Sequence, residues 1–583
     1  MITVNTRRLI RVVSLFLALL LCVSCAPTVV EPVPESETAA ETESKPESEP
    51  EPESVSSAES AEPVLTALPE VDATTIAAWR AETDERIAAI RATPSMDVGE
   101  RTCYYISNSG SDENDGLTPE TAWATLRKAS AAPIGSAVLF ERGGLFRGQL
   151  NARPNTIYSA YGEGPKPILC ASPENGADPA KWTQTPDDPT VWVYETVFRE
   201  DVGTLVFDGG NRHAIKVVLK AGDDEATVTQ SRHSGNCINM TWGTPFNDYH
   251  DLRYDLEMWH DDRDHKVYLK SVHNPGQRFS SIEFNVAHHV IRAQCDNVTI
   301  DNLCVKYGGC HGVGAVSAND LTVQNCEFGW IGGGIQYVEG NETVRFGNAI
   351  EVWCSCDNYT VENCYIYQIY DAGVTNQYEL DAGDITKDRV VNQTNVTYAH
   401  NVIEYCNYGI EYFLGSGTET NPSRIANFTI EDNHIWYAGT GFCEQRGKLG
   451  RGAAIKSWNH TNRVENFVIR DNRFIDSKDL LIHICSDLLT ADGKESMPRL
   501  SGNLFAGRKG ADFGVCSQTD KSYVPYGSHT PAYLAPLSDG DTFYLLPAEL
   551  MTEVGGAPKS RAPSSRPREL SEWIVPAKKP KIS

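Results

Sequence analysis

The chain has 583 residues with 78 acidic and 51 basic side chains, which gives a formal net charge of −27 at neutral pH. A nucleic-acid-binding protein needs a basic patch, so this balance argues against that class. The length is sufficient for a large core and one or two domains, even after the polar segments at both ends are set aside.

Residues 1–25 are typical of an export signal. Three arginines within the first eleven residues precede an apolar run over residues 12–21, and small residues follow before Cys25. The run is shorter than the ~20 apolar residues that a membrane span needs. The stretch from Cys22 to Cys25 resembles a bacterial lipobox, although Cys22 stands where that pattern prefers Leu. The resemblance implies lipid attachment at Cys25 and export to the bacterial cell surface, with ordinary cleavage and release as the alternative.

Residues 26–70 predict a disordered tether. Over residues 26–63 there are eleven Glu and one Lys, and most of the rest is Pro, Ser, Ala and Thr. Such a segment buries too little apolar surface to offset the chain entropy lost on folding. Like charges and prolines extend it, so it should hold the folded body away from the membrane. Contact with the membrane is therefore expected through the lipid anchor only.

A short strand motif recurs along the second half of the chain. Each copy is a run of β-branched residues that ends in Asn, as in Asn-Val-Thr-Ile-Asp-Asn from residue 297. A strand that repeats once per coil stacks on its own copies, and Asn at the turn tolerates a left-handed backbone and bonds to the next Asn. The copies end at Asn302, Asn325, Asn363, Asn401, Asn433 and Asn472. Cys326 and Cys364 directly follow two of these Asn residues, so they should lie in neighbouring coils.

Together these motifs resemble the right-handed parallel β-helix of the pectate-lyase-like superfamily, over residues 100–170 and 285–510. The resemblance implies an all-β solenoid and a carbohydrate ligand, but it selects no reaction. The expected order is a helix packing on the body over 71–98, a cap and first coils over 99–174, an inserted antiparallel β subdomain over 175–284, the coils that carry the site over 285–510, and an extension with a basic tail over 511–583.

A second repeated strand carries the candidate site. Because side chains alternate along a strand, the residue after each core position points outward in every coil. The core positions are Val313, Ile350, Val374, Ile410, Ile455 and Ile482. The outward column reads Gly314, Glu351, Thr375, Glu411, Lys456 and His483. The column before the core positions is almost entirely Gly and Ala.

Ionisable side chains beside small residues and aromatic rings predict a sugar-binding groove. Sugar rings stack on aromatic faces, and the coil spacing of ~4.8 Å is close to the length of one sugar residue. Insertions after Ile335, Gln377, Leu414 and Cys443 are expected to form its walls. The expected substrate-binding residues are Trp353, Gln377, Phe413, Lys456, Trp458 and His483. The alternative is that the column is ordinary solvated surface.

Glycoside hydrolysis needs two carboxyl groups across the scissile bond. Glu351 and Glu411 lie two coils apart, ~9.6 Å between backbones, near the upper end of the ~6.5–9.5 Å carboxyl separation of inverting enzymes. Asp371 lies on the intermediate coil and could supply the closer partner of a retaining mechanism. The sequence therefore predicts Glu351, Asp371 and Glu411 as the catalytic set. It also predicts a monomer that acts on a poly- or oligosaccharide without a required cofactor.

Two other functions stay open. A polysaccharide lyase acting on uronic-acid polymers could use Lys456 as its base and calcium held by Glu379, Asp381, Asp384 and Asp388. A net-acidic groove and the lack of Arg in the central column favour the hydrolase. A non-catalytic carbohydrate-binding surface protein is the third reading, but insertions concentrate on the coils that also carry the acids, which favours an enzyme.

Overall fold

The structure is a computed structural model. All its described residues belong to the second of the two units into which the chain divides, Pro63–Ser583. They cover 68–218, 248–339, 342–379, 390–415, 423–449, 452–457, 464–478, 480–485, 498–508, 512–517 and 538–547. The predicted signal and lipid-bearing Cys25 lie outside the described residues, as do Trp458 and the aspartates predicted to hold calcium, Asp381, Asp384 and Asp388. Within the described ranges, no helix combines the length and apolar character needed to cross a membrane.

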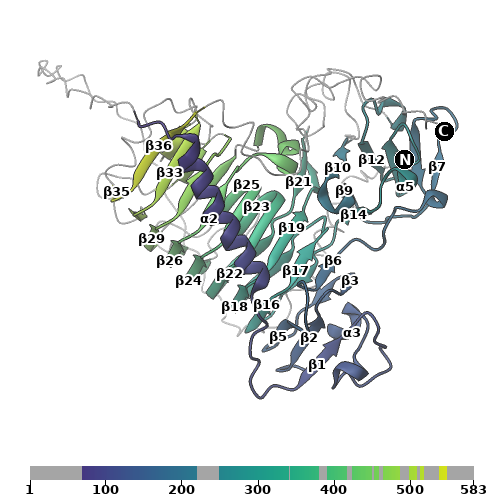
Figure 1. Cartoon of the computed structure of the whole chain (residues 1–583), viewed down its shortest axis with the longest axis horizontal. Coiled ribbons are helices and arrows are strands. Elements are labelled where there is room, and N and C mark those ends of the chain that lie inside the picture. The colour runs from purple at the N-terminus through teal and green to yellow at the C-terminus, as the bar shows by residue number, and fades with distance from the viewer. Residues whose placement is uncertain are drawn as a thin grey trace, which may run out of the picture. The chain divides into compact units, whose positions relative to one another are not determined.

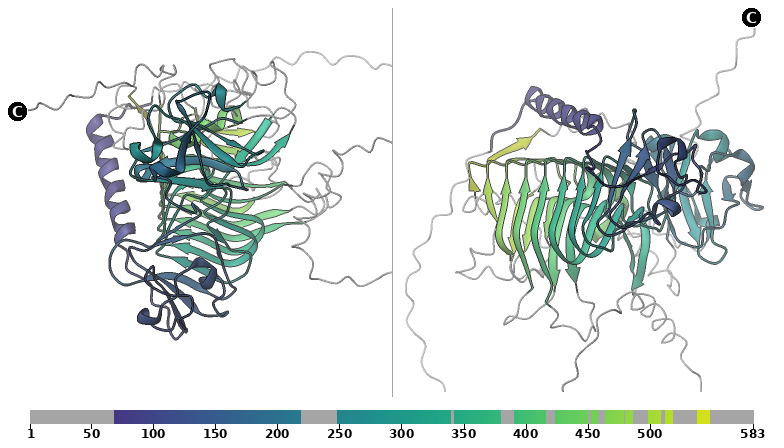
Figure 2. Two further views of the ribbon diagram at one scale, coloured as in Figure 1. Left: turned by 90° about the vertical axis from the view of Figure 1, so that its right-hand side faces the viewer. Right: turned by 90° about the horizontal axis from the view of Figure 1, so that it is seen from below.

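The body is a parallel β-helix, as the repeat predicts (Figure 1). Twenty-six strands belong to one hydrogen-bonded system in which each strand pairs in parallel with its counterpart in the next coil. Each full coil contributes a strand to three faces, here called the first, second and third face in chain order. Figure 2 shows the coils stacked side by side.

The long strands bend from one face to the next, so their two ends belong to different faces. The first face contains β4 (Leu150–Asn151), β15 (Ile291–Arg292), the starts of β18 (Val313–Gln324) and β22 (Ile350–Glu362), the ends of β23 (Tyr365–Glu379) and β25 (Val402–Gly415), β28 (Ala453–Ser457), β31 (Leu480–Cys485) and β34 (Asp512–Ser517). The second contains β1 (Cys103–Ile106), β2 (Ala137–Glu141), β5 (Ile157–Tyr161), β16 (Val298–Asp301), the ends of β18 and β22, β24 (Asn392–Ala399), β26 (Arg424–Glu431), β29 (Val464–Arg470), β32 (Arg499–Ser501) and β35 (Ser538–Asp539). The third contains β3 (Leu145–Arg147), β6 (Ile168–Cys170), β17 (Cys304–Lys306), β19 (Glu327–Ile331), the starts of β23 and β25, β27 (His434–Trp436), β30 (Arg473–Ile475), β33 (Leu504–Arg508) and β36 (Thr542–Leu546).

The first-face register is the one that the sequence predicts. The six core positions pair in the expected order, from Val313 with Ile350 through to Ile455 with Ile482. All six side chains are fully buried. Aromatic stacks continue the core on the second face, where Phe428 lies on Phe467 with ring centroids 4.5 Å apart.

The predicted Asn column is right for its first three members and shifts by one residue afterwards. Asn302, Asn325 and Asn363 have left-handed backbones, but the same position in the next coils is held by His400, Asp432 and Asp471. No residue is inserted at this turn, because Glu362 pairs with Ala399 and Tyr365 with Val402. The later Asn residues stand one position further along the coil, so Asn401 aligns with Cys364 and accepts its backbone N–H at 2.9 Å. From there the amides form a buried ladder: Asn401 donates to Asn433, and Asn433 to Asn472, at 3.0 and 2.9 Å. Cys326 and Cys364 do lie in neighbouring coils, and both thiols are free.

The small column beside the core positions has another cause than the predicted groove. A Cβ on Gly312 would lie 2.5 Å from the carbonyl oxygen of Ala349, and one on Gly409 would lie 2.6 Å from that of Ala454. Real Cβ atoms do not approach backbone so closely. These glycines are therefore required by the contact between successive coils.

The inserted segment between β6 and β15 forms two small sheets that are mainly antiparallel, as expected. Their orders are β10-β9-β14 and β11-β12-β13-β8-β7. The strands are β7 (Trp182–Gln184), β8 (Val191–Tyr194), β9 (Val202–Phe207), β10 (Arg212–His213), β11 (Ile215–Lys216), β12 (Glu257–Asp261), β13 (Lys266–Lys270) and β14 (Ile282–Val286). Short helical turns accompany the cap and the insert: η1 (Pro119–Thr121), α3 (Leu126–Ala129), η2 (Pro179–Lys181), η3 (Asp208–Gly210), η4 (Tyr249–Asp251) and α5 (Pro275–Arg278).

The long helix α2 (Ala73–Ala92) crosses the third face (Figure 1). Asp72 caps its first turn by accepting the N–H of Thr75 at 2.7 Å. Ile76, Ile87 and Ile90 are buried against the coils. Its polar side chains reach Glu327 on β19, Glu404 on β25 and His434 on β27. The helix therefore ties several coils together on the side away from the first face.

Candidate active site

The predicted ionisable column exists, but it is buried. Glu351, Thr375 and Glu411 occupy one register on β22, β23 and β25, and Lys456 and His483 continue it on β28 and β31. The exposed fractions of Glu351 and Glu411 are 7% and 4%. These burials exclude the reading that the column is ordinary solvated surface. They also show that the carboxyl groups lie beneath other residues and not along an open, small-residue groove.

Three neutral polar side chains surround the carboxyl of Glu351, and two of them donate hydrogen bonds to it. The amides of Asn348 and Gln377 both donate to its Oε2, the latter at 2.7 Å. His311 accepts the backbone N–H of Asn348 at Nδ1, so its Nε2 carries the proton and faces Oε1 of Glu351 at 3.2 Å. Burial lowers the pKa of His311 to about 3, so the ring is neutral at physiological pH. The carboxyl is thus oriented without a cation in contact with it.

This environment changes the acidity of Glu351. Burial raises its pKa to about 7; the amides of Asn348 and Gln377 oppose the shift, and the charge of Asp371 adds to it. A carboxyl of this kind holds its proton at mildly acidic pH and can donate it to a leaving group. The pKa of a general acid is best placed near the working pH.

Asp371 reaches the site through a β-bulge. Ile369 pairs with Cys406 and Ala372 with Tyr408, so two residues of β23 oppose the single Asn407 of β25. Bulges of this type redirect a side chain. Asp371 forms an ion pair with Arg446.

Arg446 comes from η5 (Gly441–Leu449), the insertion that was expected to form a wall after Cys443. Its guanidinium also lies over the ring of Tyr408 at 5.7 Å. The central column itself contains no arginine, as expected, but the insertion supplies one to the site. A second wall is the hairpin of β20 (Gly334–Glu339) and β21 (Glu342–Phe346), where the insertion around Ile335 was predicted. The insertions after Gln377 and Leu414 fall outside the described residues.

Several buried polar atoms around the carboxyl pair have no hydrogen-bond partner among the residues that the structure describes. They are Oδ1 of Asp371, Oγ1 of Thr375, Nδ2 of Asn407 and Nε of Arg446. Buried polar groups in proteins are nearly always hydrogen-bonded, so a cluster of exceptions calls for an explanation. These atoms could serve as donors and acceptors to a polar ligand.

The other residues predicted to bind substrate either continue the buried column or flank it. Lys456 lies beside Glu411 in the next strand, and its Nζ is 3.0 Å from Nδ1 of His483. Trp353 is partly buried and packs edge-on against Tyr378, with ring centroids 5.6 Å apart. Phe413 is 7% exposed. The two rings therefore present little aromatic surface, whereas Gln377 contacts Glu351 directly.

Sequence reasoning missed His311, Asn348, Asn407 and Arg446. A signal existed for the first two, because they align with each other two residues before the core positions Val313 and Ile350. Aligning the positions two residues before each core residue would have found both. Arg446 lies in an insertion, where the repeat gives no position.

Among the described residues, no group of three or more His, Cys, Asp or Glu side chains could hold a metal ion. Of the residues proposed for calcium, Glu379 ends β23 and the three aspartates lie outside the described ranges. The calcium alternative therefore stays a prediction.

No protein-family model matches this sequence, and no curated protein sequence matches it. Comparison with solved structures finds carbohydrate-active proteins. A GH136 lacto-N-biosidase from Eubacterium ramulus is 14% identical over 80% of this chain and 70% of its own, with a TM-score of 0.34. A complex of XylC with xylose is 11% identical over 76% and 82%, with a TM-score of 0.40. The pectate lyase Pel9A is 10% identical over 77% of each chain, with a TM-score of 0.34. At this level of similarity the matches concern the fold alone, and the assignment of the site depends on this protein's own residues.

Proposed function

We propose that this protein is a glycoside hydrolase in which Glu351 is the general acid and Asp371 the second catalytic carboxylate. The observation that carries the proposal is the contrast between the two groups. Glu351 is buried among neutral donors, which raises its pKa to about 7, and Asp371 is paired with Arg446. Glycoside hydrolysis needs two carboxyl groups, one of which acts as an acid, and these two carboxyls differ in their partners.

In the reaction, protonated Glu351 gives its proton to the glycosidic oxygen as the bond to the anomeric carbon breaks. Asp371 stabilises the positive charge on the sugar ring, and either attacks that carbon or takes a proton from the attacking water. One water is consumed, and the products are a hemiacetal and an alcohol. The unpartnered polar atoms of Thr375 and Asn407 would bind sugar hydroxyls, and the chemistry needs no cofactor.

Glu411 was expected to belong to the catalytic set, and we assign it to substrate binding instead. It lies two strands from Glu351, with Thr375 between them. Lys456 stands next to it in the register and His483 follows. This charged row extends the site along the coils, where the next sugar residues of a chain would lie.

The competing reaction is β-elimination on a uronic-acid polymer. Arg446 favours it, because a guanidinium can hold a uronate carboxylate, and buried Lys456 is a possible base. Against it, Arg446 is already paired with Asp371. We therefore rank the lyase second.

Activity of the full chain on neutral and uronate-containing polysaccharides, with and without chelator, tests the proposal. We expect new reducing ends without an ultraviolet-absorbing product, no effect of chelator, and loss of activity in Asp371→Asn. The anomeric configuration of the first product, followed by NMR, then separates retention from inversion. An ultraviolet-absorbing product that requires Lys456 would establish the lyase, and glycan binding without any product would establish a binding protein.

We also propose that the enzyme acts at the bacterial cell surface, anchored through Cys25. The motivating feature is the lipobox-like end of the signal segment. Metabolic labelling with a fatty acid should mark the wild-type chain and not Cys25→Ser. Equal labelling of both chains would contradict the anchor.

A further inference from the structure

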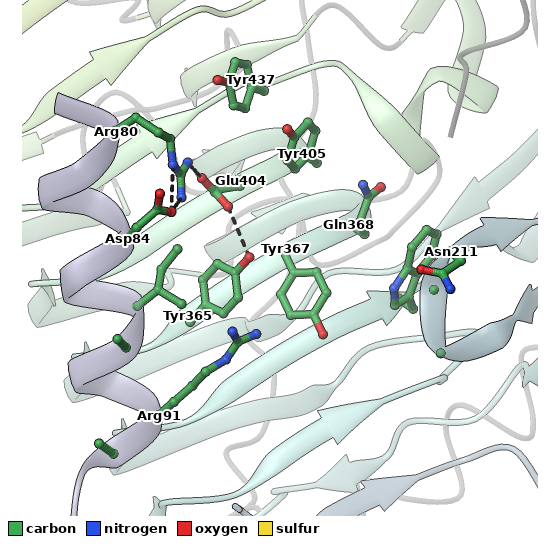
Figure 3. Close-up of a pocket in the computed structure, with 16 residues that line it drawn as sticks. Arg80, Asp84, Arg91, Asn211, Tyr365, Tyr367, Gln368, Glu404, Tyr405 and Tyr437 are labelled. Atoms are coloured by element: carbon green, nitrogen blue, oxygen red, sulfur yellow. Dashed lines mark hydrogen bonds and ion pairs between the residues drawn. The ribbon is translucent and has the colours of Figure 1, made fainter. Parts of the chain in front are cut away.

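A separate pocket lies beneath α2 on the third face. Its volume is about 850 Å³, within the ~300–1,000 Å³ of small-molecule sites. Figure 3 shows how α2, the strands β23 and β25, and the turn at Asn211 of the insert surround it. None of the catalytic carboxyl groups lines it.

One repeated turn carries aromatic rings to this pocket. In six successive coils, from β17 to β30, the fourth residue counted from the start of the third-face strand has a left-handed backbone, with φ between 53° and 58°. This conformation is unfavourable for an ordinary residue and usually selects Gly or Asn. Here four of the six positions are aromatic: the column reads Tyr307, Trp330, Gln368, Tyr405, Tyr437 and Asp476. Packing alone does not require large rings at positions with an unfavourable backbone. The column therefore points to a function for the rings.

The tyrosine rings of the pocket stack in pairs. Tyr405 and Tyr437 stack in adjacent coils with centroids 4.9 Å apart and planes 23° apart. Tyr365 and Tyr367, two residues apart on β23, stack at 4.8 Å and 20°. Trp330 lines the far side of the pocket. Tyrosine joins an apolar face with a polar hydroxyl, which suits a ligand that is apolar on its ring faces and polar at its edges.

The charged groups of the pocket are paired with one another. Arg80 bonds to both Asp84 and Glu404, as the dashed lines in Figure 3 show. Arg91 is paired with Glu327. Each cation therefore has an acidic partner, so the pocket offers hydrogen bonds without a net attraction for an anion. A uronate- or sialate-containing ligand would have to break one of these pairs.

We propose that this pocket is a second carbohydrate site that binds a neutral oligosaccharide segment independently of the catalytic residues. A glycan chain held on the third face would keep the polymer at the protein while the first face cleaves it. The inference concerns binding alone, and it stands whether the catalytic assignment holds or fails.

Binding of the full chain to an array of neutral glycans and of their uronate- and sialate-bearing counterparts tests the pocket. The key variant is Tyr405→Asn with Tyr437→Asn, because Asn removes both rings and tolerates the left-handed backbone. We expect it to lower the affinity for neutral glycans by on the order of tenfold or more, which corresponds to about 1.4 kcal/mol. Tyr405→Phe with Tyr437→Phe keeps both rings and should keep the binding.

Three controls make the result decisive. Tyr249→Asn removes a ring that stacks on Tyr268 in the insert, 4.9 Å away and outside the pocket, and should change nothing. Ala88→Trp fills the pocket from an exposed position of α2 and should block binding even if the double variant folds poorly. Glu351→Gln should bind as the wild type does. No pocket-dependent binding of any neutral glycan, pocket-dependent binding of acidic glycans only, or loss of binding in Glu351→Gln would each overturn the proposal.

Discussion

Two glutamates on different faces of the β-helix are equally buried but differ in their partners. Glu327 on the third face and Glu351 on the first are both 7% exposed. Burial alone would raise the pKa of Glu327, but the charges of Lys306 and Arg91 outweigh it and the net shift is downward. At Glu351 the contacts are neutral, and burial raises the pKa to about 7.

The difference shows that burial by itself does not mark a catalytic carboxyl. On the third face Glu327 and Glu404 are each matched by an arginine of α2, which fixes the helix to the coils. On the first face Glu351 contacts neutral polar side chains, and several polar atoms nearby have no hydrogen-bond partner within the part of the chain that the structure describes. The choice of partner makes one carboxylate a structural tie and leaves the other able to exchange a proton.

The largest effect should come from replacing the first-face acid. Glu351→Gln keeps the shape of the side chain and its contact with Asn348 but removes the transferable proton. Loss of a general acid typically lowers turnover about 10²–10⁴-fold. Steady-state kinetics on the best substrate would measure it, with Glu327→Gln as the matched control that keeps its turnover. Equal turnover losses in the two variants would remove the distinction between the faces.

The third-face acid should dominate stability instead. Glu327→Gln leaves Arg91 and Lys306 facing an uncharged amide. Removing one partner of a buried ion pair costs about 3–5 kcal/mol. Denaturant unfolding should show this loss for Glu327→Gln and a clearly smaller change for Glu351→Gln at pH 5. A stable Glu327→Gln variant would mean that the cations are well solvated without their partner.

The two glutamates should also make the free energy of unfolding depend on pH in opposite directions. The pKa of Glu351 is raised from its usual 4.5 to about 7, so its carboxyl favours the folded state below pH 4.5 and loses that advantage as the pH rises to 7. Relative to Glu351→Gln, the wild type should lose on the order of 3 kcal/mol over this interval. The pKa of Glu327 is lowered, so its contribution is present above its unfolded pKa and is lost as the pH falls.

Unfolding free energies of wild type and both variants between pH 4 and pH 8 would reveal the opposite slopes. Turnover should fall above about pH 7 for the same reason, because the general acid must carry its proton. The difference in unfolding free energy between wild type and variant could instead change with pH in the same direction for both variants. That result would show that the surroundings of the two carboxyls differ less than their contacts indicate.

The regular part of the first face was predictable from the sequence because aligned repeats fix the place of each residue within its coil. Once Val313, Ile350 and Val374 are aligned, every neighbouring column is fixed by the alternation of the strand. The same logic failed by one residue at Asn401. His400 holds the left-handed position of this coil and the Asn stands one residue later, a change that a motif ending in Asn hides.

The surroundings of the catalytic pair could not be predicted in the same way. Asp371 is presented by a bulge, and Arg446 arrives on an insertion 75 residues later in the chain. Neither a bulge nor an insertion follows the period of the repeat. The repeat therefore does not predict which coil the side chains of Asp371 and Arg446 contact.

The smallest effect should come from the exposed half of the third-face ion pair. Arg91 donates from Nε to Glu327 at 2.9 Å, but 52% of its side chain is exposed. Exposed pairs contribute only about 0.2–1 kcal/mol and are screened by salt. Lys306 also stays 3.4 Å from Glu327, so the carboxylate keeps a cation when Arg91 is removed. Arg91→Gln should therefore cost about 1 kcal/mol or less at low salt, and the difference should shrink in 1 M salt. A loss as large as that of Glu327→Gln would mean that Arg91 alone neutralises the carboxylate, and that the third face depends on one contact from α2.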